Sequence, residues 1–203
     1  EKDSTFTFCR VDRIHPDNDG QMVMAYLFLK AQGLAGNEVA DVSIDAECSE
    51  VISHKNCKIS KLKKDRHGLS FDYLAYALPY PLDSIPRQGW GNIKSQRDAM
   101  ALVPFMEEFN QERLQVANLE KGLYRLTIDG QFIDDVSSGQ LENGINLADY
   151  PTTPQYQQAM KIMYLNEERF EVEKRFREYL WTEYSFLKKE GLLFSDNQEA
   201  IGK

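Results

Sequence analysis

The distribution of apolar and polar residues at the start of the chain predicts a strand and then a helix. Residues 5–11 are largely apolar and predict a short strand, which a polar stretch ends. A helix is predicted over 21–32, and the polar residues at 17–19 are candidate N-caps. Because residues 22–29 are apolar nearly all round, we expect this helix to be buried on most sides.

The middle of the chain has the two-residue alternation that is typical of strands. Alternation predicts strands at residues 39–44, 69–73 and 113–116. Asp129-Gly130 separates two further alternating runs, 123–128 and 131–136. This dipeptide predicts a hairpin, because both central residues of a type I′ turn need positive φ. Residues 84–96 contain Gly, Pro and a Trp, and predict a long loop.

The last quarter of the chain is predicted to be helical. Pro151 and Pro154 lie near its start and Gly191 near its end. Apolar residues recur there mostly at three- and four-residue spacing, a pattern that we interpret as a packing face. These residues are Tyr156, Met160, Met163, Phe170, Phe176, Leu180, Tyr184 and Leu187.

These patterns divide the chain into three parts. Residues 1–36 hold the first strand and helix, 37–150 form a β-rich region, and 151–203 form a C-terminal helical segment. The first strand and helix cannot make a core by themselves, because a buried strand needs neighbours. We therefore expect these residues to be the C-terminal portion of a longer protein.

Composition narrows the class of protein. The chain has 203 residues, a net charge of −8 and 42% hydrophobic residues, which is enough apolar material for a core. No apolar run approaches the roughly 18 residues of a membrane span, so we expect no membrane partner. The acidic balance disfavours nucleic acid as a partner. The local cluster of lysines over 55–66 is interpreted as a solvated strand edge or loop.

The cysteines and most histidines indicate little about function. The chain has three cysteines, Cys9, Cys48 and Cys57, so they cannot all pair within the chain. The sequence leaves undecided whether Cys48 and Cys57 form a disulfide. We interpret all three as reduced thiols. No Cys or His spacing fits zinc. His54 and His67 lie beside lysines, and we expect both to face solvent.

One short segment carries candidate chemistry. Asp12 lies three residues before His15, on a loop between the predicted strand and the predicted helix. In acyl transfer a histidine removes the proton of a nucleophilic hydroxyl, and a carboxylate orients that histidine. The sequence therefore predicts Asp12 as the orienting acid and His15 as the general base.

The wider sequence resembles a known family. Asp12-x-x-His15-Pro16, followed by Gly20 and an apolar helix, is similar to the last motif block of the SGNH (GDSL-type) serine hydrolases. The downstream strings 122–130 and 144–148, together with Asn110, resemble a bacterial secreted subgroup of that family. In this family the nucleophilic Ser and the oxyanion-hole residues lie upstream of the Asp and the His. Only eleven residues precede Asp12, so these blocks cannot lie in this chain.

The resemblance implies a fold and an activity. The implied fold class is α/β plus β: the C-terminal strand and helix of an SGNH-type hydrolase, a β-sandwich-like insertion and a long C-terminal helix. The implied parent enzyme is a serine esterase in which an upstream Ser, His15 and Asp12 form the triad. It implies no metal or organic cofactor. It also implies short-acyl esters, such as acylated carbohydrate, as substrates, and a secreted or periplasmic location.

Two readings without catalysis stay open. Trp90 lies in a Gly-rich loop near Tyr76 and Tyr80, and exposed aromatic rings on a β-rich region could stack on sugars. The chain would then be a carbohydrate-binding module. Alternatively, the C-terminal helix could serve an interaction module. A calcium loop over 15–20 is a further alternative, although His15 and Tyr26 depart from that pattern.

Overall fold

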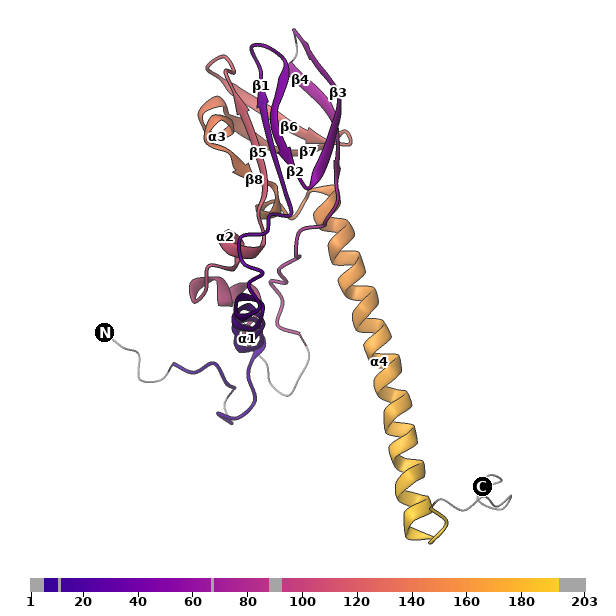
Figure 1. Ribbon diagram of the computed structural model, residues 1–203. Coiled ribbons are helices and arrows are strands. Elements are labelled where there is room, and N and C mark those ends of the chain that lie inside the picture. The colour runs from indigo at the N-terminus through magenta and orange to yellow at the C-terminus, as the bar shows by residue number, and fades with distance from the viewer. Residues whose placement is uncertain (1–5, 11, 67, 88–92, 194–203) are drawn as a thin grey trace. The chain divides into compact units, whose positions relative to one another are not determined.

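The computed structural model describes residues 6–10, 12–66, 68–87 and 93–193. The chain divides into two compact units, Glu1–Ala159 and Met160–Lys203. The first unit holds every strand in the described part of the chain, and the second holds most of one long helix (Figure 1). The division into three parts, and the α/β hydrolase class for residues 1–36, stay predictions.

A mixed four-stranded sheet forms the centre of the first unit. Its strand order is β2-β1-β5-β8, in which β1 and β5 are parallel and the two outer pairs are antiparallel. The strands are β1 (Ala40–Asp45), β2 (Glu50–Lys55), β5 (Glu112–Ala117) and β8 (Ile145–Asn146). The predicted strands at 39–44 and 113–116 are thereby confirmed.

Two hairpins accompany this sheet. They are β3 (Cys57–Asp65) with β4 (Gly68–Ala75), and β6 (Leu123–Ile128) with β7 (Gln131–Ser137). Asp129 and Gly130 connect β6 and β7 with φ of 51° and 77°, which confirms the predicted turn. The predicted strand at 69–73 lies within β4, and the lysine cluster lies largely on β3.

The main core lies on one face of the central strands. Val42 and Ile44 of β1 pair in register with Leu114 and Val116 of β5, and all four are buried. Because side chains alternate along a strand, this register places every second residue of both strands in the same apolar layer. Residues from both hairpins, including Val136, pack against it.

Parallel pairing also determines where the helices meet. α1 (Asn18–Ala31) precedes β1, whereas the 3-10 helix η1 (Arg97–Ala101) and α2 (Phe105–Phe109) precede β5. Since parallel strands start at the same edge of a sheet, these segments come together there (Figure 1). They form a second core that includes Met22, Val23, Leu82, Ala99 and Phe105.

The start of the chain differs from the expectation. The strand predicted over 5–11 is absent from its described part, residues 6–10, where the one pairing is an isolated bridge between Cys9 and Pro16. The chain turns back on itself there: the Arg13 N–H donates to the Arg10 carbonyl, and the Arg10 N–H donates to the His15 carbonyl. Among the described residues no strand lies beside this segment, which makes a turn.

α1 begins near its predicted start, and Asp17 is its N-cap. The expectation that it is buried on most sides is wrong. Met22 and Val23 are buried, but Leu27 is 56% exposed and Phe28 is 64% exposed. The apolar neighbours of α1 lie along one side, toward η1 and α2, so its other apolar side has no cover among the described residues.

The C-terminal helix is present with its predicted limits. α4 spans Pro154–Lys189, and Gly191 follows it with φ of 72°. It comes after the short α3 (Ser138–Asn143) and the 3-10 helix η2 (Leu147–Asp149). The predicted single packing face is wrong, however. Phe170 and Phe176 are six residues apart, which is about 240° around a helix, so the residues before and after this gap lie on different sides.

The other sequence expectations have mixed outcomes. Cys9, Cys48 and Cys57 are free thiols, which agrees with the interpretation from the sequence. The disulfide between Cys48 and Cys57, which the sequence left undecided, is not formed. His54 is exposed as expected, whereas His67 lies outside the described residues. No helix in the described part of the chain is long and apolar enough to span a membrane.

A buried carboxylate interrupts the apolar layer. Glu112 alternates with Leu114 and Val116 on β5 and is fully buried. One oxygen, Oε1, accepts hydrogen bonds from the Tyr73 hydroxyl at 2.9 Å and from Gln155 Nε2 at 3.1 Å, while Oε2 has no partner. Burial raises the pKa of Glu112, because the charged form loses its hydration.

This raised pKa predicts a pH-dependent stability. A carboxyl with a raised folded-state pKa contributes most at low pH, and its contribution is lost as pH rises through that pKa. The difference in melting temperature between Glu112→Gln and the wild type should therefore shift in favour of Glu112→Gln as the pH rises above the usual pKa range of a glutamate carboxyl. Thermal unfolding followed by circular dichroism measures this difference. Glu142→Gln on exposed α3 is the control for removing one negative charge, and an equal trend in both variants would contradict the prediction.

Candidate functional site

The structure brings the two predicted site residues together. Asp12 Oδ2 lies 2.8 Å from His15 Nδ1 on the turn that precedes α1. Asp12 Oδ1 accepts hydrogen bonds from the backbone N–H groups of Ile14, at 3.0 Å, and of His15, at 3.1 Å. Arg13 adopts φ of 55°, which closes the turn so that the carboxylate faces both N–H groups and the ring.

These contacts determine the charge of Asp12. The backbone N–H of Ile14, then the His15 ring, then the backbone N–H of His15 hold the pKa of the Asp12 carboxyl well below its usual range. Each of these hydrogen bonds favours the charged form. Asp12 is therefore ionised at all ordinary pH values, although its side chain is 42% exposed.

The charge of Asp12 in turn determines the tautomer of His15. An ionised carboxylate can only accept hydrogen bonds, so Nδ1 of His15 must carry the shared proton. In a neutral imidazole, Nε2 is then the atom with the lone pair. The His15 side chain is 53% exposed. This is the arrangement that a general base needs for accepting a proton at Nε2.

A buried polar network holds this turn in place. Asp17 Oδ2 accepts hydrogen bonds from the backbone N–H groups of Ile93 and Lys94, while Asp17 Oδ1 accepts one from Asn18 N. The Lys94 ammonium lies 2.9 Å from Asp19 Oδ2 and donates to the Thr7 carbonyl at 3.1 Å. The network therefore connects three segments: the chain before the turn, the start of α1 and the loop before η1.

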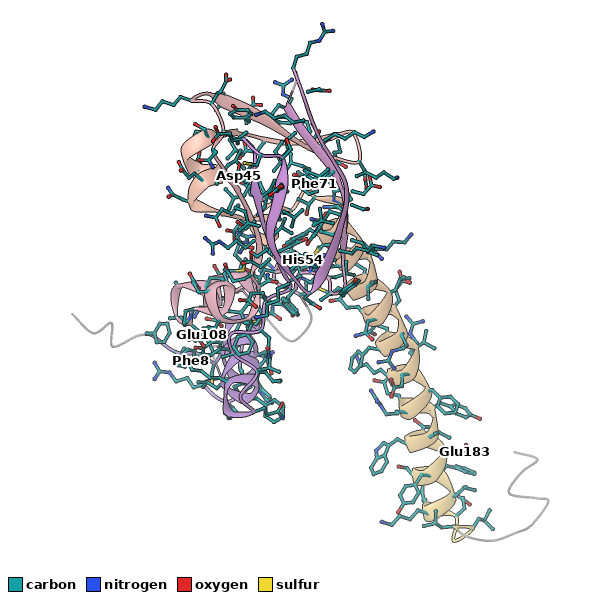
Figure 2. The ribbon with its side chains drawn as sticks, turned by 45° about the horizontal axis from the view of Figure 1, so that its top comes forward. Phe8, Asp45, His54, Phe71, Glu108 and Glu183 are labelled. Carbon is teal, nitrogen blue, oxygen red and sulfur yellow. The ribbon has the colours of Figure 1, made fainter. Side chains whose placement is uncertain are left out.

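Close backbone packing completes the arrangement. The Asp17 N–H donates to the Phe8 carbonyl at 3.0 Å, and Gly20 lies against that same carbonyl. A Cβ at Gly20 would overlap the Phe8 oxygen, so a glycine is required for this approach. Phe8 lies beside the first turn of α1, as the labelled side chain in Figure 2 shows.

Sequence reasoning missed the role of Lys94. Nothing local distinguishes this lysine, which lies 75 residues from Asp19 in the sequence. The same contact contradicts the calcium loop, because the Lys94 ammonium lies where a cation would bind Asp19. Among the described residues, no three His, Cys, Asp or Glu side chains are grouped as metal ligands. Trp90 of the carbohydrate-binding alternative lies outside the described residues.

Comparisons with known proteins bear on both units. Residues 160–203 match the family model of the diltiazem deacetylase C-terminal helical domain. A solved structure described as BT4096, a gut microbial diltiazem-metabolizing enzyme, is similar over 98% of this chain, with 55% identity and a TM-score of 0.87. This chain covers 45% of that structure's chain, so it spans less than half of that enzyme. A comparison with curated proteins gives no match.

These findings correct the family resemblance drawn from the sequence. The assignment to the SGNH (GDSL-type) hydrolases is contradicted, because the similarity is to a diltiazem deacetylase helical domain and to a diltiazem-metabolizing enzyme. The motif Asp12-x-x-His15-Pro16 is too short to identify a family. The geometry of Asp12 and His15 does not depend on that assignment, since it comes from the described contacts.

The ion pair of Asp19 and Lys94 generates a stability prediction. Asp19 is 2% exposed, so Lys94→Met should leave a buried carboxylate without its counter-charge. We expect a loss of about 3 kcal/mol in unfolding free energy, near the low end for a broken buried pair, because Lys94 is itself partly exposed.

Urea denaturation of four proteins tests this coupling. They are the wild type, Lys94→Met, Asp19→Asn and the double variant, which form a double-mutant cycle. The double variant should lose clearly less than the sum of the two single losses, because neither charge is then left alone. Strictly additive losses would show that the two side chains are not coupled.

Proposed function

We propose that this chain is the C-terminal portion of an ester hydrolase that removes acetyl groups, in which His15 is the general base and Asp12 orients it. The observation that carries the proposal is the 2.8 Å contact between the ionised Asp12 carboxylate and His15 Nδ1. It leaves Nε2 as the proton acceptor. In this proposal the nucleophilic hydroxyl comes from the part of the longer enzyme that these 203 residues do not cover.

The proposed reaction proceeds through an acyl-enzyme. His15 Nε2 takes the proton of the hydroxyl as its oxygen attacks the acetyl carbonyl carbon, and a tetrahedral oxyanion forms. When the carbonyl re-forms, the alcohol leaves and takes the proton from Nε2. Water then attacks the acyl-enzyme carbonyl carbon while Nε2 takes a proton from it. When the bond between that carbon and the enzyme oxygen breaks, acetate is released and Nε2 returns the proton to the enzyme hydroxyl. Asp12 stays ionised throughout and stabilises the imidazolium.

The comparisons support an acetyl ester as the substrate class. The matching family model describes a domain of diltiazem deacetylase, and the similar solved structure is described as a diltiazem-metabolizing enzyme. Acylated carbohydrate was expected only from the family resemblance that these findings contradict, so it is not part of the proposal.

The catalytic role of the pair is testable by substitution. In the longest natural polypeptide that contains this sequence, His15→Gln should lower kcat for p-nitrophenyl acetate by on the order of 10³-fold or more. Asp12→Asn should cost on the order of 10²-fold or more, because the ring loses its tautomer control. KM should change little, since neither group is proposed to bind the ground state.

The matched control is His54→Gln. His54 is exposed on β2, and its Nδ1 lies 3.1 Å from the Cys57 carbonyl. The substitution therefore removes a histidine that is not part of the proposed pair. Its kcat should equal that of the wild type. If His15→Gln also kept full activity, the proposal for this pair would be wrong.

The origin of the nucleophile gives a separate prediction. A fluorophosphonate probe, which reacts with activated serine hydroxyls, should label the longer polypeptide but not the 203-residue chain. Labelling is followed by mass spectrometry, and the His15→Gln form of the longer polypeptide should label much more slowly. A labelled hydroxyl within the 203 residues would place the nucleophile in this chain and overturn that part of the proposal.

A further inference from the structure

A stiff link joins His15 to the start of α1. Only Pro16 lies between His15 and Asp17, and the ring of a proline fixes its own φ at about −65°. A proline also disfavours helical backbone angles in the residue before it, so the ψ of His15 is restricted to extended values. Because few backbone rotations remain between the two residues, the position of Asp17 largely determines that of the His15 backbone.

The Asp17 carboxylate is held from two sides. The residue is 1% exposed, so the carboxylate is shielded from solvent. Oδ1 accepts a hydrogen bond from the Asn18 N–H at 2.7 Å, on the side of α1. On the other side, Oδ2 accepts hydrogen bonds from the N–H groups of Ile93, at 3.1 Å, and of Lys94, at 3.3 Å. The carboxylate therefore connects α1 to a segment that begins 76 residues further along the chain.

Neighbouring contacts restrict the same connection. The Asn18 side chain donates a hydrogen bond to the Lys94 carbonyl at 3.0 Å, so the two segments are bonded in both directions. Residues 93–94 lead directly into η1, where Ala99 is fully buried in the second core. Asp17 therefore fixes the turn that holds His15 against a part of the chain that is itself anchored in a core.

We propose that Asp17 is a positioning residue for the general base. This inference rests on the proposed function, because it concerns where His15 Nε2 lies when the hydroxyl approaches it. Asp17 holds the start of α1 against residues 93–94, and the link through Pro16 carries that position to His15. Reacting atoms must come within about 3–3.5 Å of each other, and a displacement of roughly 1 Å can cost on the order of 10²-fold in rate.

An amide cannot replace this carboxylate. Both carboxylate oxygens accept hydrogen bonds, whereas an amide has one accepting oxygen and one donating NH₂ group. In either orientation the amide of Asp17→Asn turns its NH₂ group toward a backbone N–H, either that of Asn18 or those of Ile93 and Lys94. Asparagine and serine cap helices about as well as aspartate does. Asp17→Asn and Asp17→Ser can therefore keep the cap of α1 while they lose the contact with residues 93–94.

Kinetics of the longest natural polypeptide that contains this sequence test the positioning role. Asp17→Asn and Asp17→Ser should each lower kcat for p-nitrophenyl acetate by about 10- to 100-fold and change KM by less than about twofold. The pKa that governs kcat/KM should stay close to the wild-type value, because the contacts between Asp12 and His15 do not include Asp17.

The fluorophosphonate probe separates a displaced base from a loss of folded enzyme. Unfolded molecules lower the final amount of label, whereas a displaced His15 lowers the rate constant of labelling in the folded molecules. Both Asp17 variants should reach the same final extent of labelling as the wild type, with a rate constant about 10-fold or more lower. Circular dichroism at the assay temperature measures the folded fraction of each variant.

Asp45→Asn is the matched control. Asp45, which Figure 2 labels, also accepts hydrogen bonds from two backbone N–H groups, those of Glu47 and Cys48, in the turn after β1. The substitution removes the same charge and the same kind of contact, away from the turn that holds His15. It should leave kcat and the rate constant of labelling at their wild-type values.

The outcomes distinguish this inference from the proposed function. If His15→Gln keeps full activity, the proposed function is wrong and the positioning role falls with it. If His15→Gln loses activity while both Asp17 variants keep the wild-type kcat and rate constant of labelling, only the positioning role is overturned. Two further results would also overturn it: a lower final extent of labelling at an unchanged rate constant, or an equal loss of kcat in Asp45→Asn.

Discussion

The parallel pairing of β1 with β5 is the contact on which the first unit depends. It places Val42 and Ile44 beside Leu114 and Val116 in the main core. It also brings the segments before the two strands to the same edge of the sheet, where α1 meets η1 and α2. Without that meeting, Lys94 in the loop before η1 would not reach Asp19 at the start of α1, and the turn that holds Asp12 and His15 would have no support.

The features of the fold that local chemistry determines could be predicted. Asp129-Gly130 fixed one hairpin because few other residues adopt positive φ twice in succession. Asp17 was among the residues expected to cap α1. The order of the strands could not be predicted, because it depends on pairings between distant residues. The exposed side of α1 was missed for a related reason: apolar residues indicate that a side can be covered, but not which neighbour covers it.

The candidate site likewise combines local features that could be predicted with distant contacts that could not. The three-residue spacing of Asp12 and His15 indicated that they could meet, and they do, because the turn between them is local. Lys94, Asp19 and the close approach at Gly20 gave no usable signal, since each acts through a contact with a segment elsewhere in the sequence. The family resemblance failed because short strings, the Asp12-x-x-His15-Pro16 motif and the downstream strings 122–130 and 144–148, are too little sequence to identify a family.

The separation of β1 and β5 in the sequence has a kinetic consequence. Residues 46–111 lie between the two strands, so their pairing must close a long loop before any core contact offsets the lost chain entropy. The β6–β7 hairpin needs only its two-residue turn, and such hairpins form in about 1 to 10 microseconds. Folding of the first unit is thus limited by its topology. We therefore expect the hairpins to form early and the nucleation of the parallel pair to set the folding rate of the whole unit.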